Sequence, residues 1–415
     1  MFGVSGVSGF FKLSGGSGWR KMIGASLLAF GGLSIFAVLR NSVDHVTLAL
    51  CLGTLCLAEV LSALVVAGWG ENAAEKRVNW QDALERTLAR WIVLCVLALG
   101  GLLLGFLSFF DGQPLLVLAC LGLSLCLALL KLTSACRADL WGGVMLLAQL
   151  RWLALATVVF VLSDVAKIGA DLVVALAILT TLSLWMVQAR GLLAALSQTR
   201  HYPKLGHGNS LMSFAPALLR YVDLLILPVL LSPEPALLYI AARSVGMLIE
   251  WSLDRLTRLA KPGITMAYEF ENPANFVSSA ARLNLGILLV GGGVALGVLS
   301  AAPYFSRLFG SGAGEFRDIV VWVIVAQSSP AIFGAASLLL DIARHRREVA
   351  MIRLGACLVF SVVAVLTPSS TGYLLALHYA FIQLSVCGMM AGLLAWRSGI
   401  WPGITAVLFK QIRLF

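Results

Sequence analysis

The sequence predicts an all-α protein that crosses a membrane many times. Of its 415 residues, 60% are hydrophobic and only 12% are charged, whereas soluble domains carry about 25% charged residues. The mean hydropathy is +0.94, and the apolar residues form long runs. A transmembrane barrel would instead show alternating segments of about ten residues. We therefore expect a polytopic membrane helix bundle, and the composition argues against a soluble enzyme.

Twelve apolar runs are long enough to be spans, because about 20 helical residues cross ~30 Å of hydrocarbon. In chain order they lie near 22–39, 46–69, 91–110, 115–135, 141–162, 171–195, 212–231, 236–258, 278–300, 318–340, 350–367 and 373–396. The first run follows Arg20 and Lys21, so a cleaved signal peptide is the alternative there. Its length and the full set of spans behind it favour a span.

The basic residues predict the orientation of these spans. With the N-terminus placed inside, the 30 Lys and Arg divide into 21 in inner segments, 4 in outer loops and 5 within spans. Basic residues collect on the cytoplasmic side of membrane proteins. We therefore expect both termini in the cytoplasm, and we interpret the net charge of +10 as topology and not as nucleic-acid binding.

A polar segment divides the chain in two. Residues 196–211, "LSQTRHYPKLGHGNSL", are basic and contain Pro and Gly, which predicts a cytoplasmic linker between an N-terminal lobe (1–195) and a C-terminal lobe (212–396). Since six spans is an even number, both lobes enter from the same side, as parallel repeats do in some transporters. Residues 397–415 are too short in apolar sequence to cross, and we expect them along the inner interface.

Charged residues recur on single faces of two predicted spans in the second lobe. Arg220 and Asp223 share a face of the seventh span, and Arg243, Glu250 and Asp254 share a face of the eighth. Each residue of a helix turns ~100°, and a charge in hydrocarbon costs several kcal/mol unless it meets a partner or water. These faces predict a shared polar cavity. The alternatives are that Arg220 and Asp223 form a neutral structural pair and that Asp254 snorkels to the inner interface.

A third polar face runs along the tenth span, from Gln327 through Gly334 and Ser337 to Asp341. Its alternative is a kinked helix without further function. In the first lobe, Glu59 and Arg151 are the isolated membrane charges.

No catalytic motif or metal-binding spacing is evident. The eight cysteines occur singly in or beside apolar runs, and the five histidines are dispersed, which predicts neither a disulfide framework nor a metal site. We expect no cofactor and no enzymatic reaction.

The stretch "RYVDLLILPVLLSPEPALLYIAARSVGMLIEWSLDRLTRLAKPGI" at 220–264 resembles polysaccharide flippases of the Wzx type. These belong to the MOP superfamily, which also holds the MATE multidrug exporters and the lipid II flippases. Arg220 and Asp223 match the family's Arg and Asp of the seventh span, while Arg243 and Pro262 match the following helix. The outer loop, tenth span and basic turn in "LFGSGAGEFRDIVVWVIVAQSSPAIFGAASLLLDIARHRREVAMIRLG" also resemble that family.

This resemblance implies a MATE-like fold and alternating access by two six-helix lobes. The implied cargo is a polyprenyl-pyrophosphate-linked oligosaccharide, with membrane lipid and the glycosyltransferases and polymerase of the same pathway as partners, in a bacterial inner membrane. Arginine donates to a pyrophosphate through a bidentate fork. The implied cargo-binding residues are Arg220, Asp223, Arg243, Arg151, Arg282 and Gln327, and the candidates for ion coupling are Glu250, Asp254 and Glu59.

Two other functions remain open at this point. A MATE-like drug or cation antiporter has the same fold, but cationic ligands favour acidic cavity residues without arginines. A membrane glycan polymerase or ligase is an enzyme with a large catalytic outer loop, and the longest outer loop here spans only about residues 303–317.

The predicted topology can be tested by cysteine labelling on a Cys-free background. Because the 21-to-4 division places 303–317 outside and 196–211 inside, Ser311→Cys should react with an impermeant reagent added to intact cells. Ser197→Cys should react only after permeabilisation. Labelling of Ser197→Cys in intact cells would contradict the two-lobe scheme.

Overall fold

The computed structural model divides the chain into two compact units, residues 1–206 and 207–415. The described residues are 45–67, 80–97, 114–136, 170–196, 210–270, 273–307, 312–367 and 371–403. The boundary between the units falls within the predicted linker 196–211, of which residues 197–209 lie outside the described segments.

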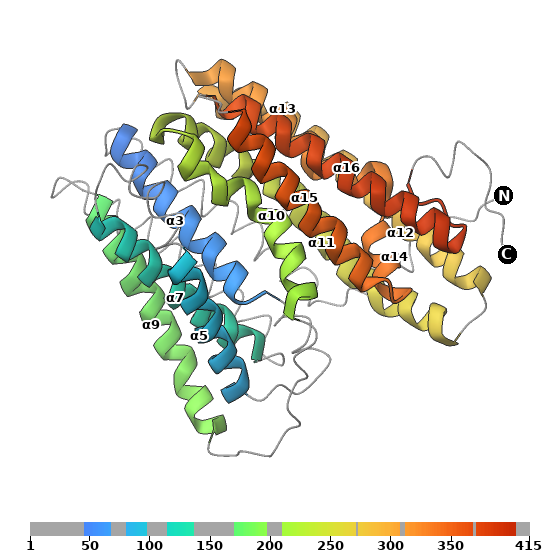
Figure 1. Cartoon of the computed structure of the whole chain (residues 1–415), viewed down its shortest axis with the longest axis horizontal. Helices are drawn as coiled ribbons and strands as arrows, with labels where there is room; N and C mark the ends of the chain where they lie inside the picture. The colour runs from blue at the N-terminus through green and yellow to red at the C-terminus, as the bar shows by residue number, and fades with distance from the viewer. Residues whose placement is uncertain are drawn as a thin grey trace. The chain divides into compact units, whose positions relative to one another are not determined.

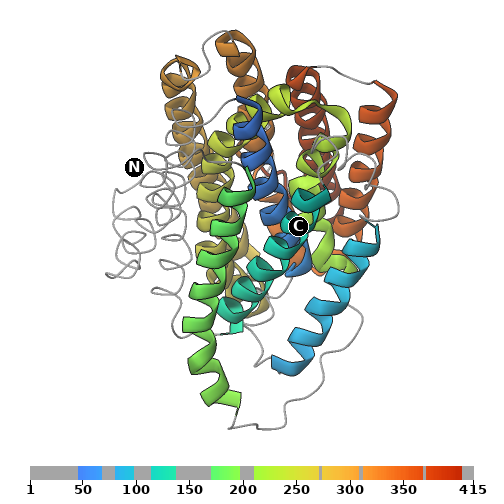
Figure 2. The same ribbon diagram turned by 90° about the vertical axis from the view of Figure 1, so that its left-hand side faces the viewer.

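Four helices of the first unit are described: α3 (His45–Val65), α5 (Trp80–Leu97), α7 (Pro114–Cys136) and α9 (Ala170–Leu196). Helix α7 packs against both α3 and α9, as Figure 2 shows. The predicted spans near 22–39 and 141–162, and residues 98–110 of the third span, lie outside the described segments.

The second unit is described almost throughout. Its helices are α10 (Ser210–Leu230), α11 (Pro233–Phe270), α12 (Pro273–Ser306), α13 (Ala313–Phe333), α14 (Ala336–Ile342), α15 (Arg346–Leu366) and α16 (Gly372–Ser398). Helix α13 packs against α11, α12 and α16, and α10 packs against α15 (Figure 1). In both units every described element is a helix, which confirms the predicted all-α class.

Proline and glycine set several helix ends. Pro114, Pro233 and Pro273 are each the first residue of a helix, where the missing N–H would have had no intrahelical acceptor and the fixed φ suits a helix. Gly399 ends α16 in the left-handed region, with φ 69°, and its N–H donates to the carbonyl of Ala395 at 2.9 Å. This is the C-terminal cap that glycine adopts without steric cost.

Seven of the described helices are long and apolar enough to cross a membrane: α3, α7, α11, α12, α13, α15 and α16. On α12, Leu285, Leu289 and Leu296 are 58%, 66% and 66% exposed, as expected of a helix face solvated by lipid. Helix α11 has 38 residues, or about 57 Å at ~1.5 Å per residue, so the helix extends beyond the predicted span 236–258 at both ends. The fold is a polytopic membrane helix bundle.

The predicted single span 318–340 is wrong in one respect, because the structure interrupts it. Helix α13 ends at Phe333, and Gly334 adopts φ 74° and ψ −171°, a conformation essentially restricted to glycine. Asn284 Oδ1 accepts a hydrogen bond from the N–H of Ala335 at 2.8 Å, just after the break. The sequence therefore gives two helices, α13 and α14, where its hydropathy indicated one.

Helices α11 and α13 approach closely at Gly246. A Cβ atom at this position would collide with the side chain of Val323 on α13. The same addition at Gly263, on the same helix, would meet nothing within 4 Å. Gly246 therefore allows a helix contact that any larger residue would push apart.

We predict different effects of the same substitution, glycine to alanine, at these two positions. Gly246→Ala should lower the melting temperature of the detergent-solubilised protein, because Val323 or the helix axis must move. Gly263→Ala should leave it unchanged or raise it, since alanine is favoured over glycine in a helix by about 1 kcal/mol. Equal melting temperatures for the two variants would show that the α11–α13 contact adapts without cost.

Candidate functional site

Two pairs of charged residues from α10 and α11 form one network in the second unit. Arg220 and Asp223 lie on α10, and Arg243 and Glu250 lie on α11. On each helix the two residues are close in angle, about 60° apart for the first pair and about 20° for the second. The two helices turn these faces toward each other, so that each acid meets a base from the opposite helix.

The inner half of the network is fully buried. Arg243 Nε donates to Asp223 Oδ2 at 2.9 Å, and both side chains are at most 1% exposed. The hydroxyl of Tyr239, one helical turn before Arg243, donates to the same oxygen at 2.7 Å. Asp223 Oδ1 is buried and receives no hydrogen bond from the described residues, so the charge of Asp223 depends on its contacts through Oδ2.

The remaining nitrogens of Arg243 also have acceptors. Nη2 donates to the backbone carbonyl of Arg220 at 2.7 Å and to the Tyr379 hydroxyl at 3.0 Å, and the guanidinium lies 5.1 Å from the centre of the Tyr379 ring. Nη1 lies 3.4 Å from Glu250 Oε2. When the side-chain amide of Gln327 on α13 is turned so that its nitrogen donates to Glu250 at 3.0 Å, its oxygen accepts from Arg243 Nη1 at 2.5 Å. One side chain thus joins α10, α11, α13 and α16.

The outer half of the network is partly exposed. Arg220 Nε donates to Glu250 Oε1, and Arg220 Nη2 lies 3.6 Å from Asp254 Oδ2. The side chains of Arg220, Glu250 and Asp254 are 35%, 22% and 32% exposed. Asp254 also accepts from the exposed Arg258 at 2.9 Å. Of the two arginines that pair across α10 and α11, Arg220 is therefore the one with an exposed surface.

The network carries little net charge. Arg220 and Arg243 balance Asp223 and Glu250, and Arg258 balances Asp254. An anion that approaches Arg220 meets a guanidinium whose charge is already compensated by carboxylates.

The alternative in which Arg220 and Asp223 pair with each other is wrong. Asp223 pairs with Arg243, and the described acids that pair with Arg220 are Glu250 and Asp254. The two tyrosines were also missed by the sequence analysis. Tyr239 gave a usable signal, because it lies four residues before Arg243 and so on the same face. Tyr379 gave no such signal, since it lies on another helix, 136 residues after Arg243 in the chain.

The other predicted site residues lie in different places. Gln327 belongs to the network, whereas Arg282 is exposed on α12 and forms none of the ion pairs found among the described residues. Arg151 lies outside the described segments. In the first unit, Glu59 accepts from Lys131 at 2.6 Å, and the same ammonium donates to Ser62 at 2.6 Å. Glu59 is thus part of a separate α3–α7 contact.

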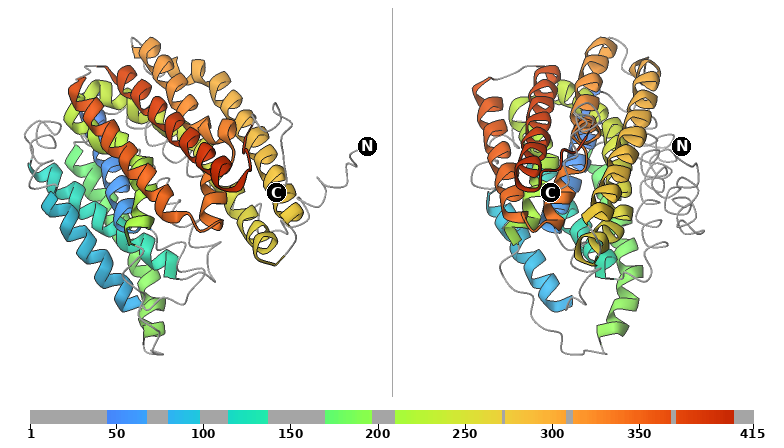
Figure 3. Two further views of the ribbon diagram at one scale, coloured as in Figure 1. Left: turned by 45° about the vertical axis from the view of Figure 1, so that its right-hand side comes forward. Right: turned by 90° about the vertical axis from the view of Figure 1, so that its right-hand side faces the viewer.

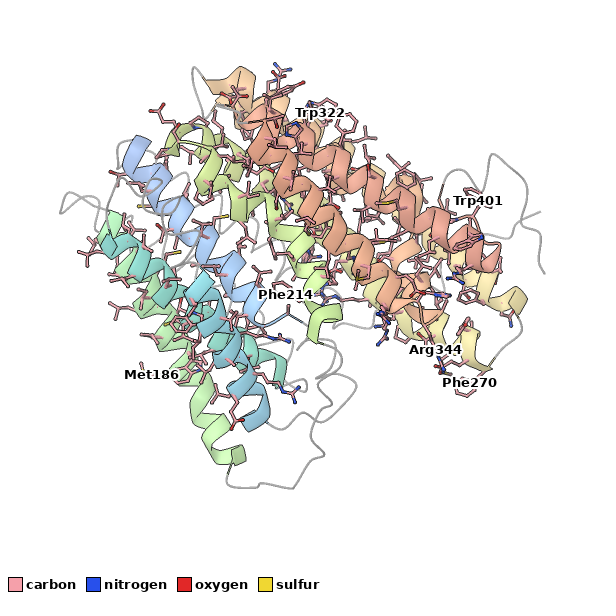
Figure 4. All side chains as sticks on the ribbon, viewed as in Figure 1. Met186, Phe214, Phe270, Trp322, Arg344 and Trp401 are labelled. Carbon is pink, nitrogen blue, oxygen red and sulfur yellow. The ribbon has the colours of Figure 1, made fainter. Side chains whose placement is uncertain are left out.

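The polar face predicted along the tenth span divides at the break in that span. Beyond Gly334, Ser337 accepts from Arg353, and Asp341 pairs with Arg346 and with Lys261. Figure 4 shows Arg344, Phe270 and Trp401 at that end of the unit, away from Trp322. Within the described segments, no three His, Cys, Asp or Glu side chains gather so as to hold a metal ion.

Comparison with known proteins gives a structural likeness and no sequence relative. No family model and no curated protein matches the chain. The crystal structure of a MATE mutant superposes with a TM-score of 0.53 over 89% of this chain and 92% of that one, at 13% identity. The chain has the MATE fold. A further structure, named protein A, has a TM-score of 0.56 at 12% identity and covers 91% of this chain and 94% of that one.

At these identities the likeness establishes the fold alone, so the cargo must be argued from the residues of this chain. In this MATE fold the arginines occupy two environments. Arg243 is enclosed by protein acceptors, and Arg220 retains an exposed surface.

These environments predict that removing Arg243 lowers the stability of the folded protein more than removing Arg220 does. Arg243→Ala leaves Asp223 charged and uncompensated in the interior, which costs about 3–5 kcal/mol, so the melting temperature in detergent should fall sharply. Arg220→Ala should cost less, because Glu250 retains Arg243 and Gln327. Adding Asp223→Asn to Arg243→Ala should recover part of the loss. Similar melting temperatures for the two single variants would contradict this assignment.

Proposed function

We propose that this protein is a secondary transporter that moves a polyprenyl-pyrophosphate-linked oligosaccharide across a bacterial inner membrane by alternating access. The fold supports the general class, because the chain is a membrane helix bundle with the MATE architecture. The observation that carries the choice of cargo is Arg220, an arginine that keeps 35% of its side chain exposed beside a fully buried ion-pair cluster.

The chemistry of the guanidinium suits this cargo. A pyrophosphate at membrane depth needs cationic hydrogen-bond donors, since its charge is otherwise unsolvated. Arginine stays protonated and presents two parallel donors that match phosphate oxygens. The glycan and the pyrophosphate would cross through the protein, while the polyprenyl tail remains in lipid.

The contacts divide the predicted cargo residues by role. Arg220 receives the phosphate in this scheme, and Arg243 holds the helices that present it, because its own nitrogens have protein acceptors. Gln327 positions Glu250 and Arg243. Arg151 and Arg282 are second-rank cargo contacts, and Glu250, Asp254 and Glu59 are candidates for coupling to an ion gradient.

The proposed setting follows from the same argument. A lipid-linked glycan is assembled on the cytoplasmic leaflet, so glycosyltransferases would supply it and a glycan polymerase would receive it on the other side. The division of basic residues supports the part of this proposal in which both termini lie in the cytoplasm.

A drug or cation antiporter of MATE type is the second candidate. The observation that favours it is the pair of partly exposed carboxylates, Glu250 and Asp254, which would bind a cation once Arg220 moved away. This candidate predicts transport of cationic dyes that depends on Glu250 and does not depend on Arg220.

The flippase proposal can be tested by glycan export in a flippase-null strain. Arg220→Ala should abolish export, because no neutral side chain replaces the charge-assisted bonds to phosphate. Arg220→Lys should restore only part of it, since lysine keeps the charge but lacks the fork. Membrane levels of each variant are measured first.

A matched control uses Arg307→Ala, which removes an exposed arginine that stacks on Tyr304, away from the network. It should export normally. Normal export by Arg220→Ala at normal membrane levels would exclude Arg220 as the phosphate site. If the unaltered protein fails to restore export but expels cationic dyes, the antiporter is the better assignment.

A further inference from the structure

The guanidinium of Arg220 is already occupied by anions. Glu250 Oε1 accepts from Nε, and Asp254 Oδ2 lies 3.6 Å from Nη2. The two acids are four residues apart on α11, so they stand one turn above the other on one helix face. Two carboxylates from successive turns thus flank the part of Arg220 to which two phosphates of a cargo would bind.

Both acids can release Arg220 without being left unpaired. Glu250 retains Arg243 Nη1 at 3.4 Å and the amide of Gln327 at 3.0 Å. Asp254 retains Arg258 at 2.9 Å. Asp223 differs, because losing Arg243 would leave it with Tyr239 as its remaining described hydrogen-bond donor. Of the two arginines that pair across α10 and α11, Arg220 can therefore change partners and Arg243 cannot.

We propose that Glu250 and Asp254 are internal competitors for the phosphate site: they hold Arg220 when no cargo is bound, and they displace the cargo's phosphates at release. This inference rests on the proposed function, because it takes Arg220 to be the phosphate site. When the cargo binds, its phosphate must displace a carboxylate from Arg220, because the guanidinium is not unpaired when the cargo arrives.

The exchange solves a physical problem of transport. Charge-assisted bonds between arginine and phosphate are strong where water is scarce, and an uncompensated arginine would retain its cargo. A competing carboxylate on the same protein lowers the affinity and fills the site as the phosphate departs. Removing the competitor should therefore tighten binding and slow transport at the same time.

The experiment measures binding of geranylgeranyl pyrophosphate to the purified full-length protein in detergent. Glu250→Gln removes the charge but keeps an acceptor for Arg243, and Asp254→Asn removes the outer charge. Each substitution should lower the Kd of the probe by roughly tenfold. In the protein without probe, Arg220 then has one charge-assisted bond fewer, so less free energy is lost when the probe binds. Glu250→Gln should also export glycan more slowly than the unaltered protein in the flippase-null strain.

The control is Asp341→Asn. Asp341 is also a partly exposed acid paired with arginine, with 29% of its side chain exposed against 32% for Asp254, but it lies outside the network. Its Kd should equal that of the unaltered protein. If Glu250→Gln does not fold, Asp254→Asn decides alone, because Asp254 pairs with Arg220 and Arg258 and not with the inner half of the network.

The outcomes separate this inference from the proposed function. Tighter binding by both acid variants, and loss of binding by Arg220→Ala, supports the competition. If Arg220→Ala loses binding but neither acid variant gains affinity, the competition is refuted and the phosphate site stands. If Arg220→Ala binds the probe as well as the unaltered protein, or if no variant binds it, both the proposed site and the competition are refuted.

Discussion

The second unit depends on the burial of a single guanidinium, that of Arg243. Taking a charge out of water costs several kcal/mol unless it is paired and hydrogen-bonded. Here the pairing is supplied by Asp223, Tyr379, Gln327 and a backbone carbonyl of α10. Because these groups come from three helices, α10, α13 and α16, and Arg243 itself comes from α11, the solvation of one cation fixes how four helices meet. Hydrophobic packing alone would not specify that arrangement, since lipid is as apolar as the helix surfaces.

The charges of the network are graded from buried to accessible. Asp223 and Arg243 are at most 1% exposed, Glu250 is 22% exposed and Arg220 is 35% exposed. The buried pair has no alternative partner of equal quality and serves as a fixed support. The accessible pair has alternatives on both sides. The fixed pair and the exchangeable pair are thus only one or two turns apart on α10 and α11. Glu250 contacts both, because it accepts from Arg220 and from Arg243.

Much of the fold could be predicted from the sequence, and the pairing within the site could not. The predicted span 373–396 is the helix Gly372–Ser398, because a hydrocarbon layer dictates the length of an apolar run. Helical spacing also predicted that Arg243 and Glu250 share a face. Spacing within one helix, however, does not say which acid meets which arginine across two helices. That depends on helix tilt and on distant residues such as Tyr379.

The break at Gly334 escaped prediction for a different reason. The residues around it, "AIFGAAS", are apolar enough to continue the span, and hydropathy does not register a backbone conformation. The interruption is fixed by the glycine φ of 74° and by Asn284 on a neighbouring helix. A glycine inside an apolar run is compatible with a straight helix as well, so the sequence alone left both outcomes open.

Helix α11 continues without interruption from Pro233 to Phe270, through Pro262 (Figure 3). Glu250 lies 20 residues before its end, a lever arm of about 30 Å at ~1.5 Å per residue. If the segment from Glu250 to Phe270 turned as a straight rod, a tilt of about 10° at Glu250 would carry its far tip about 5 Å. A change of partner at Arg220 that tilted α11 would therefore move Phe270, and a probe attached at the tip would report on an ion pair that it never touches.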